Sequence, residues 1–117
     1  MTAESLIFDA LKTLVADRVY FDVAPIKTTR PYLTCQQVGG QSVNFLDSAS
    51  PSKRNARFQI NVWAVSRISA ALLAGQVEGA MRAASALQTT VLGQPVSTYE
   101  PDTLLFGTRQ DFSVWTS

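Results

Sequence analysis

The sequence from Arg57 to Ala64 is Arg-Phe-Gln-Ile-Asn-Val-Trp-Ala, and every second residue, starting at Phe58, is apolar. Alternation with a period of two is typical of a strand that is buried on one face only. We therefore predict a strand here, with Phe58 and the residues of its parity in the core. The other parity, which includes Gln59, Asn61 and Trp63, is predicted to lie on the opposite face of the sheet.

The period changes directly after this strand. From Ser66 to Leu87, apolar residues recur at steps of three and four, which predicts an amphipathic helix. The hydroxyl of Ser66 is placed to act as an N-cap, accepting a hydrogen bond from a free backbone N–H of the first turn. A strand that leads almost directly into the longest helix is therefore the centre of the predicted fold.

The same helix carries a ridge of small residues at four-residue steps, namely Ala71, Gly75, Gly79 and Ala83. A glycine inside a helix costs about 1 kcal/mol relative to alanine, so two of them on one ridge suggest a close backbone approach. Charged and amide residues interrupt the apolar run, which argues against a membrane dimer motif. We expect the first helix of the chain to cross the second at this helix-crossing ridge.

The remaining elements predict one domain over residues 1–117. An apolar repeat from Thr2 to about Ala16 predicts a first amphipathic helix. Further strands are predicted at residues 19–23, 32–38, 96–99 and 104–115, and the unpatterned residues 47–55 are predicted to form a mobile basic loop. Because the connections are short, these elements predict an α+β fold, an antiparallel sheet with two helices packed on one face.

Composition excludes several kinds of chemistry. The 117 residues include no histidine and one cysteine, so Ser–His and Cys–His pairs, an internal disulfide and a cysteine-based metal site are excluded. No apolar run of about 20 residues predicts a membrane span, and the N-terminus does not resemble a signal peptide. The net charge of +1 gives no overall attraction to nucleic acid or membrane.

Catalytic candidates are weak. Glu100 and Asp102 are the one close pair of acids, and because they flank Pro101 in a predicted turn we interpret them as solvated turn residues. Cys35 lies on the apolar parity of its strand, which favours a buried and inert thiol. We predict that the protein is not an enzyme and that it uses no cofactor and no metal.

Positive charge gathers in one segment. Between Ser48 and Val77 the chain has no acidic residue and four basic ones, which are Lys53, Arg54, Arg57 and Arg67. Two interpretations stay open: the loop is simply solvated, or Lys53, Arg54 and Arg57 face DNA phosphates or an acidic partner.

The polar sheet face is a candidate oligomer interface. Trp63 and Trp115 fall there together with Gln59, Asn61 and Arg109, and tryptophan and arginine are enriched at protein contacts. The alternative is a bulge in either strand, which would reverse the parity and place a tryptophan in the core.

The order of these segments resembles that of the small tail-completion, or tail-terminator, proteins of long-tailed phages and prophages. The resemblance covers nearly the whole chain and carries no catalytic motif. Its most specific part is the Gln-x-x-Val-Trp-Ala element that ends at Ala64. The other matching segments are Arg18-Val19-Tyr20, Pro31-Tyr32-Leu33-Thr34-Cys35-Gln36, Met81-Arg82-Ala83-Ala84 and Asp111-Phe112-Ser113-Val114-Trp115.

This resemblance implies a structural role in the virion. Proteins of the family form a ring, commonly a homo-hexamer, which stops the tail tube, joins the tail to the head connector and lets DNA pass through its lumen. The implied partners are other copies of the chain, tail-tube and head-connector proteins, and DNA bound without sequence specificity, and no membrane. The implied location is the head–tail junction, and the host cytoplasm during assembly. The alternative is a non-viral cytoplasmic oligomer that acts as a protein-interaction module.

Overall fold

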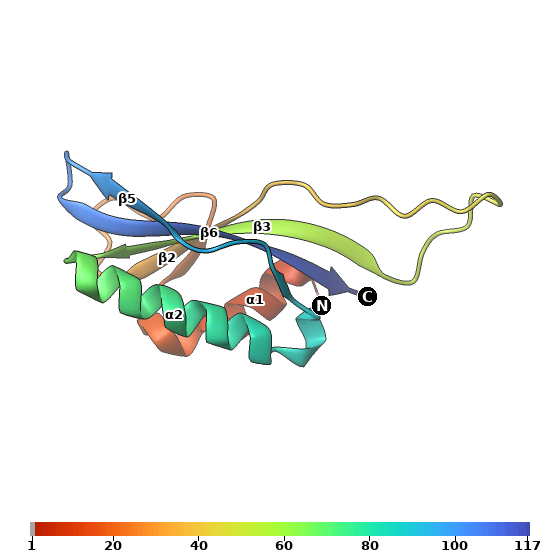
Figure 1. Ribbon diagram of the computed structural model, residues 1–117, viewed down its shortest axis with the longest axis horizontal. Helices are drawn as coiled ribbons and strands as arrows, with labels where there is room; N and C mark the ends of the chain where they lie inside the picture. The colour runs from red at the N-terminus through yellow and green to blue at the C-terminus, as the bar shows by residue number, and fades with distance from the viewer. Residues whose placement is uncertain (1) are drawn as a thin grey trace.

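The protein is an α+β sandwich of one sheet and one helical layer, as the sequence predicts (Figure 1). The computed structural model describes residues 2–117. Both helices, α1 (Ala3–Leu11) and α2 (Arg67–Ala83), cover the same face of the sheet. The six strands are β1 (Val19–Phe21), β2 (Tyr32–Gln37), β3 (Arg54–Ala64), β4 (Thr90–Val91), β5 (Val96–Glu100) and β6 (Leu105–Thr116).

The sheet is built around the long antiparallel pair β3 and β6, which are in register from Arg54↔Thr116 to Ala64↔Phe106. The strand order is β1-β2-β3-β6-β4, and β5 also pairs with β6. Phe58 and Phe112 face each other across the central pair, and both side chains are fully buried. The predicted parity of β3 is confirmed, because its alternate residues from Ala56 to Ala64 lie in the core.

Helix α2 begins and packs as its sequence pattern predicts. Ser66 has an extended backbone, and its hydroxyl accepts a hydrogen bond from the Ser69 N–H at 3.1 Å, so it is the N-cap. The predicted apolar stripe faces the sheet, with Leu73, Val77 and Met81 buried. This stripe fixes how the helix is rotated about its own axis.

The helix-crossing ridge is a wrong prediction. Ala71, Gly75, Gly79 and Ala83 are all exposed, and no described heavy atom lies within 4 Å of a Cβ built on either glycine. Helix α1 instead adds Ile7 and Leu11 to the core that the apolar stripe of α2 completes. The larger apolar stripe decides which face is buried, because burying Leu, Val and Met side chains gains far more than burying glycine.

The sheet also differs from the purely antiparallel prediction at one edge. Strand β1 pairs with β2 in parallel, from Val19↔Leu33 to Phe21↔Cys35. Thr2 caps α1 by accepting from the Ser5 N–H, and the chain after α1 continues as a 3-10 helix over Lys12–Val15. Residues 22–31 carry the chain back to the end of the sheet where β1 began, so β1 and β2 run in the same direction.

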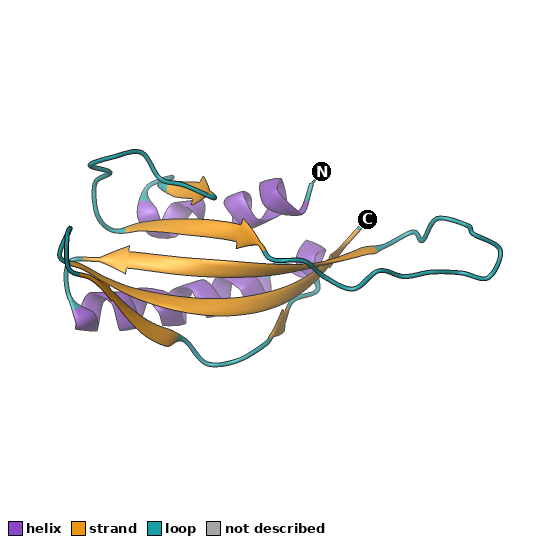
Figure 2. Cartoon of the chain, turned by 90° about the horizontal axis from the view of Figure 1, so that it is seen from above, coloured by secondary structure: helices purple, strands orange, loops and turns teal. Residues whose placement is uncertain are grey.

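The connection between β2 and β3, residues 38–53, leaves the body as a long arm (Figure 2). Strand β3 begins at Arg54, so Lys53 lies in the arm whereas Arg54 and Asn55, predicted to be loop residues, belong to the strand. At the root, the Asn55 amide holds both sides, accepting from the Gln41 N–H and donating to Ser113 Oγ. We call residues 38–53 the arm throughout.

Candidate functional site

The predicted interface residues share one face of the sheet. Gln59, Asn61 and Trp63 follow each other on β3, and Arg109 lies opposite Asn61 on β6. Their neighbours of the other parity are buried against the helices, so these side chains point to the face that the helices leave open. The register of β3 and β6 therefore brings these four residues together on one face.

Trp63 is held rigidly on this open face. Its indole Nε1 donates to Thr34 Oγ1 at 3.1 Å, and its ring lies against Gly107, the residue opposite it on β6. A Cβ at Gly107 would stand 3.0 Å from Trp63 Cε3 and 2.7 Å from the Val62 carbonyl oxygen. Glycine is therefore required at this position by the close approach of the indole and of the neighbouring strand.

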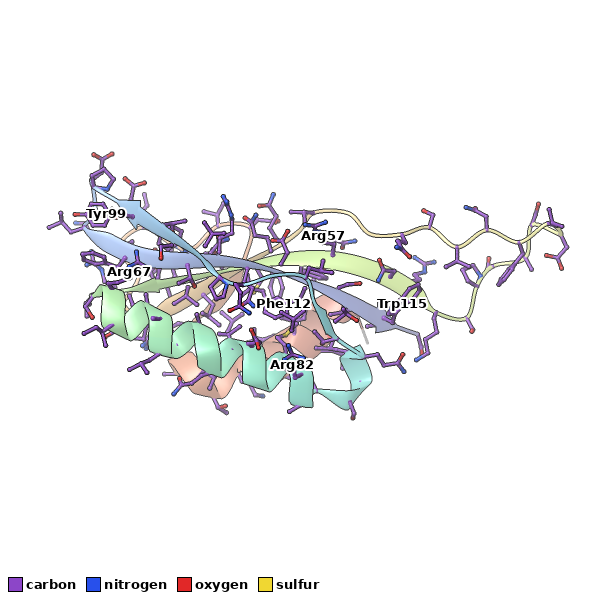
Figure 3. The ribbon with its side chains drawn as sticks, in the orientation of Figure 1. Arg57, Arg67, Arg82, Tyr99, Phe112 and Trp115 are labelled. Atoms are coloured by element: carbon purple, nitrogen blue, oxygen red, sulfur yellow. The ribbon has the colours of Figure 1, made fainter. Side chains whose placement is uncertain are left out.

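Trp115 has the predicted parity but lies apart from Trp63. It pairs with Asn55 near the root of the arm (Figure 3). Trp63 pairs with Gly107 toward the other end of the ladder. Eight residues of strand separate the two positions along β3, which corresponds to about 26 Å. The two tryptophans thus mark opposite ends of the open face and do not form one patch.

Arg57, grouped with Lys53 and Arg54 as a candidate contact of the basic loop, is a residue of β3, in agreement with the predicted strand. Its guanidinium donates to Asp111 Oδ2 at 2.7 Å and 3.0 Å across the β3–β6 pair. The side chain is half-exposed, so the pair is worth about 0–1 kcal/mol. Part of the expected positive charge is therefore neutralised within the sheet, and the charge at the arm is that of Lys53 and Arg54.

Arg67, the fourth basic residue of this segment, is a structural anchor that sequence reasoning missed. Its guanidinium donates to the Gly107 carbonyl oxygen at 2.7 Å and to the Thr98 carbonyl oxygen at 2.6 Å. It also lies over the Phe106 ring, 5.6 Å from the centroid. One side chain thus ties the start of α2 to both strands of the β5–β6 hairpin, and no periodic pattern in the sequence marks that role.

The weak catalytic candidates of the sequence lie at the end of β5 and inside the sheet. Glu100 is the last residue of β5 and Asp102 lies in the turn after it, where the Asp102 N–H donates to Glu100 Oε1. Cys35 is fully buried, and that burial raises the pKa of its thiol to about 12. Hydrogen bonds from the Gln110 amide and from Arg82 lower the pKa of Glu78.

Residues 2–117 contain no group of three or more His, Cys, Asp or Glu side chains placed to hold a metal ion. Within the same part of the chain, no helix is long and apolar enough to cross a membrane. The features that the structure does present are an open sheet face and a projecting arm.

Comparison with protein families identifies the family of the chain. The chain belongs to the phage tail-completion family, because the family model described as "Tail completion protein gp17" matches residues 7–117. None of the curated proteins compared with the chain matches it. The family gives the protein a structural role in a phage tail, and the resemblance found in the sequence is confirmed.

Proposed function

We propose that the protein forms a ring of identical subunits, commonly six, which ends the tail tube and joins the tail to the head. The observation that carries this proposal is the family match over residues 7–117 combined with the open, rigid sheet face. In a ring, DNA passes through the lumen without sequence-specific contacts, in keeping with a net charge of +1. The protein then acts in the host cytoplasm during assembly and stays at the head–tail junction of the virion.

The open face is the proposed contact between subunits. It presents Gln59, Asn61 and Trp63 in sequence along β3, with Arg109 opposite Asn61 on β6. Trp115 lies on the same face near the arm. Tryptophan and arginine side chains suit a protein contact because they are enriched at interfaces, and Trp63, which Thr34 already holds, loses little side-chain freedom on binding. In the same proposal, Lys53 and Arg54, with Arg57 beside them, face an acidic partner surface or the phosphates of DNA.

The test compares two charge reversals. Arg109→Glu places a negative charge on the open face, and Lys12→Glu makes the same change of charge at a partly exposed position just after α1, on the helical side. We expect Arg109→Glu to raise the concentration needed for assembly by about tenfold or more, since unpaired charge at an interface disfavours binding. Lys12→Glu should assemble as the parent does. Native mass spectrometry and electron microscopy, alone and with tail tubes, give the readout.

Two results would contradict the proposal at different levels. Assembly that is equally insensitive to both reversals would remove the open face from the contact and leave the ring in place. A parent protein that stays monomeric at high concentration, even with tail tubes present, would contradict the ring itself.

A further inference from the structure

The tip of the arm is an apolar surface without a partner among residues 2–117. Val43, Phe45 and Leu46 are exposed, and Leu46 is fully so. A tight turn fixes this tip, because the Ser48 N–H donates to the Phe45 carbonyl oxygen and the Ala49 N–H donates to Asp47 Oδ1. One exposed leucine would be ordinary, but three apolar side chains gathered on a projecting tip form a patch of the kind that marks a contact.

A second exposed apolar surface lies at the other end of the molecule. It consists of Val65, Ile68, Tyr99 and Leu104, whose exposed fractions run from 49% to 75%. Val65 directly follows the last residue of β3 and Leu104 directly precedes β6, and these two strands pair at that end. We call these four residues, with the acids Glu100 and Asp102, the hairpin pole.

The hairpin pole is preformed. Arg67 ties β5 to β6 through the carbonyl oxygens of Thr98 and Gly107, and the Arg30 guanidinium donates to the Thr103 carbonyl oxygen in the turn itself. Tyr99 packs against Phe106 with 4.9 Å between ring centroids. Figure 3 shows Tyr99 and Arg67 together at this end.

Leu104 is held in a strained conformation there. Its φ is 55°, in the left-handed region, which costs a residue with a Cβ of order 1–3 kcal/mol. Six other residues with a Cβ also have a positive φ, so this conformation by itself does not mark a binding surface. The backbone of Leu104 therefore fixes where its exposed side chain stands at the hairpin pole.

The two surfaces are complementary in charge as well as in polarity. Lys53 and Arg54 lie at the base of the arm, whereas at the hairpin pole Glu100 ends β5 and Asp102 lies in the turn that follows. The molecule measures 52 × 25 × 24 Å, and Figure 1 shows the arm and the β5–β6 turn at its opposite ends. A chain cannot join its own two ends at that separation, so a contact between them must join two copies.

We infer that the arm of one copy docks on the hairpin pole of the next, with Phe45 and Leu46 against Tyr99 and Leu104, and Lys53 and Arg54 toward Glu100 and Asp102. This inference rests on the proposed self-assembly and names the partner of the basic arm. DNA is the less suitable occupant, because phosphates would leave the apolar tip unused and would repel Asp47. A contact between two different surfaces of the same chain is heterologous, the type that generates rings.

Thiol cross-linking tests this contact directly. One preparation carries Leu46→Cys and a second carries Leu104→Cys, and they are mixed, assembled and treated with a short bis-maleimide. The native Cys35 does not interfere, because it is fully buried and its pKa is about 12. We expect cross-linked dimers that contain one chain of each kind.

The matched control replaces Leu104→Cys by Gln76→Cys, an equally accessible position on the exposed side of α2. It should give no such dimers. Assembly without cross-linking between Leu46→Cys and Leu104→Cys would overturn the inference while the ring stands. Failure of the parent to assemble at all would overturn both.

A charge exchange provides a second measurement. Lys53→Glu with Arg54→Glu should raise the concentration for half-assembly by about tenfold, since like charges then meet at the contact. Adding Glu100→Lys with Asp102→Lys to the same chain should restore it. If the restoring pair has no effect and the first pair instead abolishes retention of linear double-stranded DNA in a gel-shift assay, the arm binds DNA and the inference is wrong.

Discussion

The body of the protein and its arm are specified in different ways. In the body, β3 and β6 alternate core and open-face residues along a single register, so each outward side chain is positioned by a buried neighbour. The arm has its root fixed by Asn55 and its tip closed by a turn, and its apolar side chains contact no core. The side chains of the body therefore determine the stability of the fold. Those of the arm contribute little to that stability and are free to contact another molecule.

The largest expected difference is between two phenylalanines. Phe58→Ala removes a fully buried ring opposite Phe112 and should cost about 3–5 kcal/mol of unfolding free energy. Phe45→Ala removes a half-exposed ring from the arm and should change stability by about 0.5 kcal/mol or less. Urea unfolding of the monomer measures both, and a large loss with Phe45→Ala would show that the arm packs on the body.

A smaller effect is expected at the junction of α2 and the β5–β6 hairpin. Arg67→Met keeps most of the aliphatic length but removes two charge-assisted hydrogen bonds to backbone carbonyls, and should cost about 2 kcal/mol. Arg82→Met, which breaks an exposed helical pair with Glu78, is the control and should cost about 0.5 kcal/mol. Hydrogen exchange should then increase in residues 96–109 for Arg67→Met alone. Equal losses in the two variants would contradict the anchoring role of Arg67.

The smallest effect has the opposite sign. Gly79→Ala adds a methyl group in open space and should stabilise the protein by about 1 kcal/mol through helix propensity. Gly107→Ala is the contrasting change, because its Cβ would lie 2.6 Å from Thr98 Oγ1, so it should destabilise. Thermal melting distinguishes the two, and destabilisation by Gly79→Ala would restore the predicted helix crossing.

Sequence patterns predicted the elements whose burial repeats with a fixed period. The alternation around Phe58 and the stripe through Val77 each reflect many buried side chains, and both are confirmed. The ridge through Gly79 failed because small residues fit a close helix crossing and an exposed surface equally well. The parallel pairing of β1 was missed because three residues carry no register information.

The candidate site was predicted in part for the same reason. The alternation of apolar and polar residues was enough to place Trp63 and Trp115 on the open face. It does not say which residues of β3 and β6 pair, so the distance between the two tryptophans could be known only from the strand register. The hairpin pole was missed because exposure of Tyr99 and Leu104 depends on what the rest of the chain covers. The charge count of the basic segment could not show that Arg57 and Arg67 are engaged within the fold.

Strand β3 has a mechanical consequence. It starts at the root of the arm and ends at the hairpin pole, and it is paired with β6 along its whole length. Tension between the two ends therefore acts along the strand axes, whereas the ladder hydrogen bonds lie perpendicular to them. Loaded in this shear direction, the bonds resist together instead of opening one after another. The body is therefore expected to resist extension along β3 and β6, which is the direction in which neighbouring copies would pull on the subunit.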